Sequence, residues 1–238
     1  MPRFFEKVTG DDVIISGENA QHIAKSLRMS SGECITLCDD GIDYHCEIQS
    51  VNADSVHCRV VKKEQNLTEP DVQVTLYQCV PKSDKLEYVV QKAVELGVSA
   101  VVPVLSERCV SRPDEKSAHK KGQRYNKIAL EACKQSGRGK VVEVLPMISF
   151  AKAVDQIKNF DAAVLFYEGG GAPLKEIIAK QKSVCIFIGP EGGFAPEEVE
   201  LARQNGAVAA TLGKRILRTE TAPIAALTAV MLLTGNME

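Results

Sequence analysis

One stretch of the sequence decides the fold: Val184-Cys185-Ile186-Phe187-Ile188, followed directly by Gly189-Pro190-Glu191-Gly192-Gly193-Phe194. Five apolar residues in a row are typical of a strand buried on both faces of a parallel sheet. The three glycines after it let the backbone approach a ligand closely, and ligands of parallel sheets bind where the strands end. A tight turn without a ligand is the alternative interpretation.

The spacing of these glycines disfavours the common nucleotide-binding motifs. It does not match G-x-G-x-x-G, the sequence contains no G-x-x-x-x-G-K-[ST], and Pro190 lacks an amide hydrogen for a phosphate. A nicotinamide-dependent oxidoreductase is therefore disfavoured.

Apolar strands alternate with helical patterns around this stretch. We expect strands at 72–79, 100–105, 141–145, 162–167, 184–188 and 207–212. We expect helices at 84–96, 123–136, 150–157, 174–180, 196–205 and 222–233. This alternation predicts a parallel α/β sheet. The last helix is apolar nearly all round, which predicts that it is buried.

The first part of the chain has a different rhythm. Short strands are expected at 13–15, 33–38, 44–48 and 55–61. Together with one helix that ends near Met29, they indicate a small β-barrel. Residues 62–71 are polar and contain Pro70, so they are the best candidate for a linker between two domains. We therefore expect two domains, at 1–68 and 72–238.

A second candidate ligand loop, Leu212 to Ala222, follows the next strand. Thr219 or Thr221 can cap the helix after it. Capping does not explain the apolar residues beside Arg218, which suit an apolar ligand wall with a guanidinium next to it. Because the two loops follow successive strands, they can line one pocket.

Charge is distributed unevenly, although the formal total is only −2. Residues 108–140 hold ten basic and three acidic side chains, a net +7, and the remainder carries −9. Such a stretch can attract RNA phosphates, and the alternative is a solvated helix face. Within it, Arg138 lies just past a helix end, where it can bind a phosphate or complement the helix dipole.

Composition disfavours several classes of protein and site. No apolar run reaches the roughly 20 residues of a membrane span, and the first residues lack the apolar region of a signal peptide. The eight cysteines include no C-x-x-C pair, so we expect reduced, buried thiols in a cytoplasmic protein and no metal site. The four histidines lie far along the chain from the glycine loop, which argues against histidine acid–base chemistry there.

Together these motifs resemble one family, the small-subunit ribosomal RNA uridine-N3 methyltransferases of the SPOUT superfamily. The most specific matches are Gly189-Pro190-Glu191-Gly192-Gly193 and Leu217-Arg218-Thr219-Glu220-Thr221-Ala222. The other matches are Pro2-Arg3-Phe4-Phe5, His22 to Arg28, Lys82-Ser83-Asp84-Lys85, Gln91 to Gly97, Ser106-Glu107-Arg108 and Gln135-Ser136-Gly137-Arg138. The chain departs from the family pattern at Lys134, Val94 and Val142, all outside the glycine loop.

The resemblance implies a fold and a set of partners. It implies an RNA-binding PUA-like β-barrel at 1–68 and a SPOUT α/β domain with a carboxy-terminal deep trefoil knot at 72–238. It also implies S-adenosylmethionine as the cofactor, no metal, and a homodimer that completes each active site. The substrate would be one uridine of small-subunit (16S) ribosomal RNA, as naked RNA or in the assembled 30S subunit.

The motif match also implies site residues. The cofactor residues would be Phe166, Ile188, Gly189, Pro190, Glu191, Gly192, Gly193, Leu212, Gly213, Ile216, Leu217 and Thr221. From the distribution of charge, we expect the RNA-binding residues to be Arg3, Arg28, Arg108, Lys120, Lys121 and Arg124. Arg218 or Arg138 would supply the cation beside the uracil oxygens, and Glu220 or Glu191 would accept a proton.

Two other functions stay open at this point. One is a non-catalytic RNA-binding or ribosome-assembly protein that retains the fold. The other is a SPOUT methyltransferase that acts on another RNA nucleotide.

Overall fold

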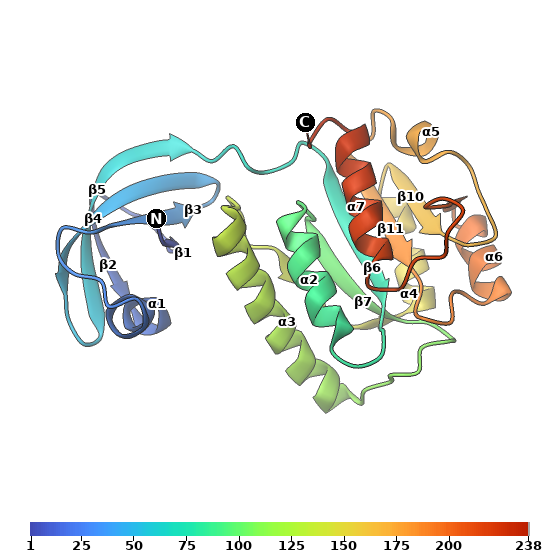
Figure 1. Cartoon of the computed structure of the whole chain (residues 1–238), viewed down its shortest axis with the longest axis horizontal. Coiled ribbons are helices and arrows are strands. Elements are labelled where there is room, and N and C mark those ends of the chain that lie inside the picture. The colour runs from blue at the N-terminus through green and yellow to red at the C-terminus, as the bar shows by residue number, and fades with distance from the viewer. Residues whose placement is uncertain (238) are drawn as a thin grey trace. The chain divides into compact units, whose positions relative to one another are not determined.

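The chain, seen here as a computed structural model that describes residues 1–237, divides into two compact units (Figure 1). The first contains Met1–Glu69 and Cys133–Val141, and the second contains Pro70–Ala132 and the residues from Val142 onward. The sequence placed Cys133–Val141 in the second domain, but backbone and side-chain contacts hold it in the first. Gly139 O accepts hydrogen bonds from Gly41 N (3.0 Å) and from Cys38 Sγ (3.2 Å).

The first unit is a five-stranded sheet of order β1-β3-β4-β5-β2. Its strands are β1 (Arg3–Phe5), β2 (Asp12–Ser16), β3 (Cys34–Asp39), β4 (Ile42–Val51) and β5 (Ser55–Gln65). Helix α1 (Gly17–Gln21) continues into a π-helical turn, η1 (His22–Ser26). β1 pairs with β3 in parallel, and the other pairs are antiparallel. The predicted strands are confirmed, although β5 extends into the expected linker.

The second unit is a seven-stranded sheet in which every described pair is parallel, as predicted. Its order is β12-β10-β11-β6-β7-β8, and β9 pairs with β7. The strands are β6 (Gln73–Cys79), β7 (Ala100–Leu105), β8 (Glu143–Val144), β9 (Ile148–Ser149), β10 (Ala162–Phe166), β11 (Ser183–Ile188) and β12 (Val208–Ala210). The helices are α2 (Lys85–Glu95), α3 (Glu115–Ser136), α4 (Phe150–Asp155), η2 (Ile157–Asn159), α5 (Leu174–Ile178), α6 (Pro196–Gln204) and α7 (Ala222–Leu233).

Helix α3 begins eight residues before the predicted start at residue 123. Asp114 caps its first turn, because its carboxylate accepts a hydrogen bond from Ser117 N at 2.7 Å. Gly122 lies inside the helix, and a Cβ added to it would meet no other atom within 4 Å. The basic stretch therefore includes more helix and less loop than expected.

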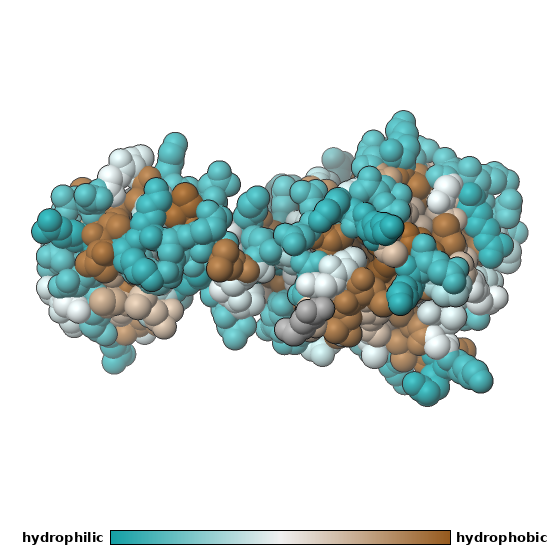
Figure 2. Space-filling model, turned by 90° about the horizontal axis from the view of Figure 1, so that it is seen from above, coloured by the Kyte–Doolittle hydropathy of each residue, from teal (hydrophilic) through white to brown (hydrophobic). Residues whose placement is uncertain are grey.

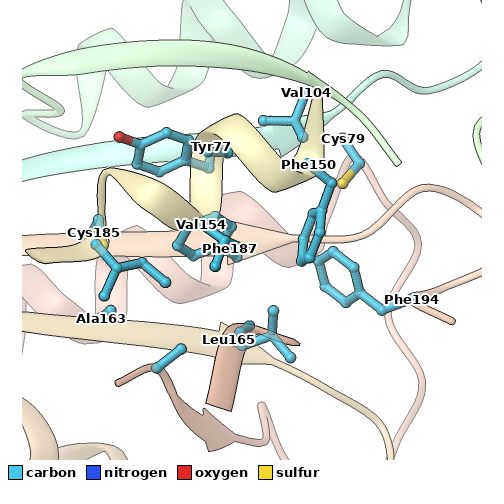
Figure 3. Close-up of a cluster of buried hydrophobic side chains, with 14 of the residues drawn as sticks. Tyr77, Cys79, Val104, Phe150, Val154, Ala163, Leu165, Cys185, Phe187 and Phe194 are labelled. Carbon is cyan, nitrogen blue, oxygen red and sulfur yellow. The ribbon is translucent and has the colours of Figure 1, made fainter. Parts of the chain in front are cut away.

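An aromatic core holds the glycine loop in place (Figure 3). Tyr77 stacks on Phe187 with ring centroids 4.6 Å apart. Phe150 lies between Phe187 and Phe194, with centroids 6.1 and 5.5 Å away. Because Phe194 is only 2% exposed, the end of the glycine loop is anchored in the core.

Helix α7 is buried along one side, through Ala226, Leu227, Val230 and Met231. The prediction of burial all round is wrong at its end, where Leu232 and Leu233 are 54% and 41% exposed. Among the helices of residues 1–237, none combines the length and hydrophobicity that crossing a membrane requires. The knot implied by the family resemblance stays a prediction.

The cysteines are all free thiols. Seven are buried, as expected, but Cys34 is exposed at the start of β3. Its partner on the same strand face, Cys38, is buried.

Candidate active site

A pocket of about 520 Å³ lies where β10, β11 and β12 end. Its walls come from the end of β10, the glycine loop after β11, the loop between β12 and α7, and Lys85 at the start of α2. The volume falls in the range of about 300–1,000 Å³ that is usual for small-molecule sites. The sequence prediction that the two loops line one pocket is confirmed.

The glycine loop is a tight turn whose backbone faces this pocket. Gly193 N donates to Pro190 O at 2.9 Å, and Gly193 has a φ of +67°, which favours glycine. A Cβ on Gly189 would lie 3.3 Å from Gly193 Cα. The loop is therefore tightly folded around these two glycines, and both line the pocket.

Thr219 ties the two pocket loops together. Its hydroxyl donates to Gly189 O at 2.8 Å and accepts from Gln78 Nε2 at 3.2 Å. Of the two threonines predicted to cap α7, Thr221 does occupy its N-cap, but its side chain makes no capping hydrogen bond. Gln78 is fully buried, and its Oε1 has no hydrogen-bond partner within residues 1–237.

Lys85 bridges the same two loops by charge. Its ammonium lies 2.9 Å from Glu220 Oε2 and 3.4 Å from Glu191 Oε1. The hydrogen bond from Lys85 lowers the pKa of Glu220, and the same bond raises the pKa of Lys85. Burial alone would raise the pKa of Glu191, but hydrogen bonds from its own amide, Lys82 N and Lys85 lower it. Both carboxylates are therefore ionised at neutral pH.

Arg218 lines the pocket with an exposed guanidinium. Its backbone is fixed, since Arg218 O accepts hydrogen bonds from Thr221 N and Ala222 N, both at 2.9 Å. Within residues 1–237 its guanidinium has no hydrogen-bond partner. Arg218 is thus a positioned cation whose charge is available to a ligand.

Arg138, the other predicted catalytic cation, has a structural role in the first unit. It is 4% exposed, and its Nε and Nη2 donate to the two carboxylate oxygens of Glu69 at 2.8 and 2.7 Å. Burial would raise the pKa of Glu69, but the hydrogen bonds and charge of Arg138 outweigh it and lower the pKa. Bidentate pairing of a buried guanidinium leaves it unavailable to a substrate, which corrects the sequence expectation.

Most of the predicted cofactor residues line the pocket. They are Phe166, Ile188, Gly189, Pro190, Glu191, Gly193, Leu212, Gly213, Ile216 and Leu217. Gly192 and Thr221 do not line it. Gly192 instead accepts a hydrogen bond on its carbonyl from Arg108 Nη1 at 2.9 Å. Glu220, a catalytic candidate, reaches the pocket only through Lys85.

The predicted RNA-binding residues differ in their availability. Arg28 and Lys120 are exposed, and Lys121 is half-buried. Arg124 is exposed but pairs with Glu87 at 2.6 Å. Arg3 is corrected, because its guanidinium is 13% exposed and donates to Asp43 at 2.7 Å, which makes it a structural residue of the sheet.

Sequence reasoning assigned no role to several pocket residues, above all Lys85, Tyr167 and Glu168. Each follows an apolar strand, so the rule that predicted the glycine loop could have indicated them too. Residues 1–237 contain no cluster of three or more histidine, cysteine or acidic side chains that could hold a metal ion.

Comparison with known proteins identifies the family. A model of the RNA methyltransferase domain matches residues 68–231, and a model of the RNA methyltransferase PUA domain matches residues 15–61. The Bacillus subtilis ribosomal RNA small subunit methyltransferase E is 37% identical over 97% of this chain and 96% of its own length. The chain belongs to this methyltransferase family.

Solved structures agree with this assignment. A ribosomal RNA small subunit methyltransferase E from Neisseria gonorrhoeae, bound to S-adenosyl methionine, is 34% identical with a TM-score of 0.90 over 98% of both chains. A Legionella pneumophila protein in complex with the bound cofactor SAM is 30% identical with a TM-score of 0.88, over 97% of this chain and 96% of its own.

Proposed function

We propose that this protein transfers a methyl group from S-adenosylmethionine to N3 of one uridine in small-subunit (16S) ribosomal RNA. The observation that carries the proposal is the pocket at the ends of β10, β11 and β12, whose lining includes both the glycine loop and Arg218 with its unpaired guanidinium. Family membership supports the same chemistry, since the curated relatives are small-subunit ribosomal RNA methyltransferases.

The residues of the pocket fit S-adenosylmethionine. Phe166, Ile188 and Leu217 offer apolar surface for an adenine ring, and Gly189 and Gly193 bring the backbone of the glycine loop into the pocket wall beside it. When bound, S-adenosylmethionine supplies a methyl group already activated by its sulfonium. The protein then has to align the uridine and deal with one proton.

Arg218 serves the uracil ring in this proposal. Loss of the N3 proton spreads negative charge over O2 and O4, and a fixed cation beside those oxygens stabilises that charge. Arg218 is suited to this because its backbone is held by two hydrogen bonds while its guanidinium stays unpaired.

Glu220 accepts the N3 proton through a water molecule, because its own side chain does not line the pocket. Its pKa is lowered by Lys85, so it is ionised at neutral pH and passes a proton on to solvent rather than keeping it. Lys85 also forms an ion pair with Glu191, and in this scheme that ion pair keeps the glycine loop in position.

RNA binding involves the basic face of α3. Lys116, Lys120 and Lys127 are exposed on this helix, and their positive field can attract phosphates. In the first unit, Arg28 offers one exposed cation next to η1.

A homodimer and a cytoplasmic location are part of the proposal. Figure 2 shows hydrophobic residues, in brown, on the side of the second unit where Figure 1 places the C-terminal end of α7. Leu232 and Leu233 are exposed there, and a second copy could cover them. Analytical ultracentrifugation tests this, because a particle of monomer mass would contradict it.

Mass spectrometry of nucleosides from ribosomal RNA tests the proposed reaction. Cells that lack this protein should lose 3-methyluridine from their small-subunit RNA, and restoring the chain should restore it. Unchanged 3-methyluridine, or loss of a different modified nucleoside, would contradict the proposal.

A further inference from the structure

Glu168 is an acidic pocket residue that the proposed reaction does not use. It follows β10 almost directly, lines the pocket and is exposed. Its carboxylate has no hydrogen-bond or ion-pair partner within residues 1–237. Glu191 and Glu220, by contrast, both pair with Lys85. Glu168 is therefore the pocket carboxylate whose acceptor oxygens are left for a ligand.

The backbone holds Glu168 in a fixed place. Tyr167 N donates to Ala210 O, and Ala172 N donates to Ala209 O, both at 2.9 Å, so the turn is tied to β12 on each side. A Cβ on Gly171 would lie 2.0 Å from Ala209 O, so the turn packs against β12 more tightly than any larger residue allows.

The side chain of Glu168 lies over the glycine loop. A Cβ on Gly193 would lie 3.2 Å from Glu168 Oε2 and 3.3 Å from Oε1. Both carboxylate oxygens thus lie beside the glycine loop. An ionised carboxylate can only accept hydrogen bonds, so a ligand at this place has to offer donors or a cation.

Glu168 and Lys85 approach the glycine loop from strands on opposite sides of β11. Glu168 follows β10 and Lys85 follows β6, and β11 lies between these two strands. Neighbouring strands are about 4.8 Å apart, so the ends of β10 and β6 are separated by roughly 10 Å. The candidates for proton transfer lie beside Lys85, which leaves Glu168 to a part of the cofactor away from the transferred methyl group.

We propose that Glu168 recognises the ribose of S-adenosylmethionine, with its two carboxylate oxygens accepting hydrogen bonds from the 2′- and 3′-hydroxyls. This inference rests on the proposed function, because it assumes that the pocket holds this cofactor. A vicinal diol offers two adjacent donors, and a carboxylate offers two adjacent acceptors, so one side chain satisfies both hydroxyls. Glu168 thereby selects a ribonucleoside.

Calorimetric titration of the full-length protein tests this role. The ligands are S-adenosylmethionine, its product S-adenosylhomocysteine, and the 3′-deoxy analogue of that product. The variant is Glu168→Gln, and the control is Glu143→Gln, an exposed carboxylate on β8 outside the pocket. Thermal unfolding of each variant checks that the fold is retained.

Glu168→Gln should lower the affinity for S-adenosylmethionine and for S-adenosylhomocysteine by the same factor, about 10- to 100-fold. The reason is that charge-assisted hydrogen bonds to the ribose are removed from both complexes. The 3′-deoxy analogue should bind wild type more weakly than S-adenosylhomocysteine does. Its affinity for Glu168→Gln should be little lower than its affinity for wild type. Glu143→Gln should bind like wild type.

Two results would overturn the ribose contact while leaving the proposed function intact. One is equal affinity of wild type and Glu168→Gln for both natural ligands. The other is a loss of affinity in Glu168→Gln for S-adenosylmethionine alone, which would place the carboxylate beside the sulfonium charge. If wild type bound neither ligand, the proposed function itself would fail.

Discussion

Arg138 in the first unit and Arg218 in the second have similar local sequence contexts. Each lies next to a helix end, in a motif that matches the family. Their surroundings differ. Arg138 is buried and forms a bidentate pair with Glu69, whereas Arg218 is exposed in a pocket with its guanidinium unpaired. A paired, buried guanidinium stabilises the fold, and an unpaired one in a pocket can stabilise charge on a substrate.

The acidic residues of the two regions also differ in what they hold together. Glu69 and Glu220 both have a lowered pKa because a cation bonds to them. Glu69 also accepts hydrogen bonds from Gly139 N (2.8 Å) and Lys140 N (3.2 Å), so it fastens a whole segment to the first unit. Glu220 instead accepts its side-chain hydrogen bond from Lys85 at the edge of a pocket, where a proton can be exchanged.

Replacing Arg218 should have the largest effect on the reaction. Arg218→Ala should lower kcat by about 10²- to 10³-fold, because a preorganised cation is removed from the developing charge. The dissociation constant for S-adenosylmethionine should stay near that of wild type, as measured by calorimetry. Arg203→Ala on α6 is the control, and unchanged turnover in Arg218→Ala would refute the role.

Replacing Arg138 should affect stability instead. Arg138→Ala should lower the free energy of unfolding by about 3 kcal/mol, because Glu69 is left partly buried without its cation. Urea unfolding measures this change, and turnover per folded molecule should stay within a few-fold of wild type. A large drop in turnover with unchanged stability would show that Arg138 is catalytic.

Reversing charge on α3 should weaken RNA binding more moderately. The triple variant Lys120→Glu, Lys121→Glu and Arg124→Glu should bind ribosomal RNA on the order of tenfold less tightly or worse. Its salt slope should fall by about 0.7–0.9 for each phosphate that the helix no longer neutralises. Filter binding against salt concentration measures both quantities. Reversal of the exposed Lys152, Lys158 and Lys182 is the control, and equal effects of the two triple variants would contradict the assignment.

Breaking the Lys85 bridge should have a smaller effect. Lys85→Met should weaken S-adenosylmethionine binding by about tenfold, because the two pocket loops are no longer joined by a shared, charge-assisted hydrogen-bond donor. Lys85→Arg should restore most of the affinity. If Lys85→Met bound the cofactor as wild type does, the bridge would not position the loops.

The pair of Arg138 and Glu69 should also respond to acid. The folded pKa of Glu69 lies below its ordinary value of 4.5, so its stabilising effect is fully present above pH 4.5. This effect disappears as the pH falls through the lowered pKa. The difference in unfolding free energy between wild type and Glu69→Gln should therefore shrink below pH 4.5, and a difference independent of pH would contradict the pairing.

Local pattern was sufficient to predict much of the fold and part of the site. The apolar run ending at Ile188 and the glycines after it predicted both a parallel strand and a ligand loop, because both follow from short-range sequence. The predicted start of α3 was eight residues late, since the first turns of this helix are polar and resemble a loop until the Asp114 cap is seen.

Long-range pairing was not predictable in the same way. Nothing near Arg138 in sequence indicates Glu69, which is 69 residues away, and nothing near Lys85 indicates Glu220, which is 135 residues away. Both partners are brought close only by the fold. A charged residue in a motif therefore cannot be assigned to catalysis until its partners are known.

The central claim is that the pocket of the second unit methylates uridine N3 through Arg218, while Arg138 stabilises the fold. The most direct test is mass spectrometry of nucleosides from small-subunit ribosomal RNA incubated with purified protein and methyl-labelled S-adenosylmethionine. We expect labelled 3-methyluridine with wild type and with folded Arg138→Ala, and almost none with Arg218→Ala. Label on another nucleoside, or the opposite order of the two variants, would contradict the account.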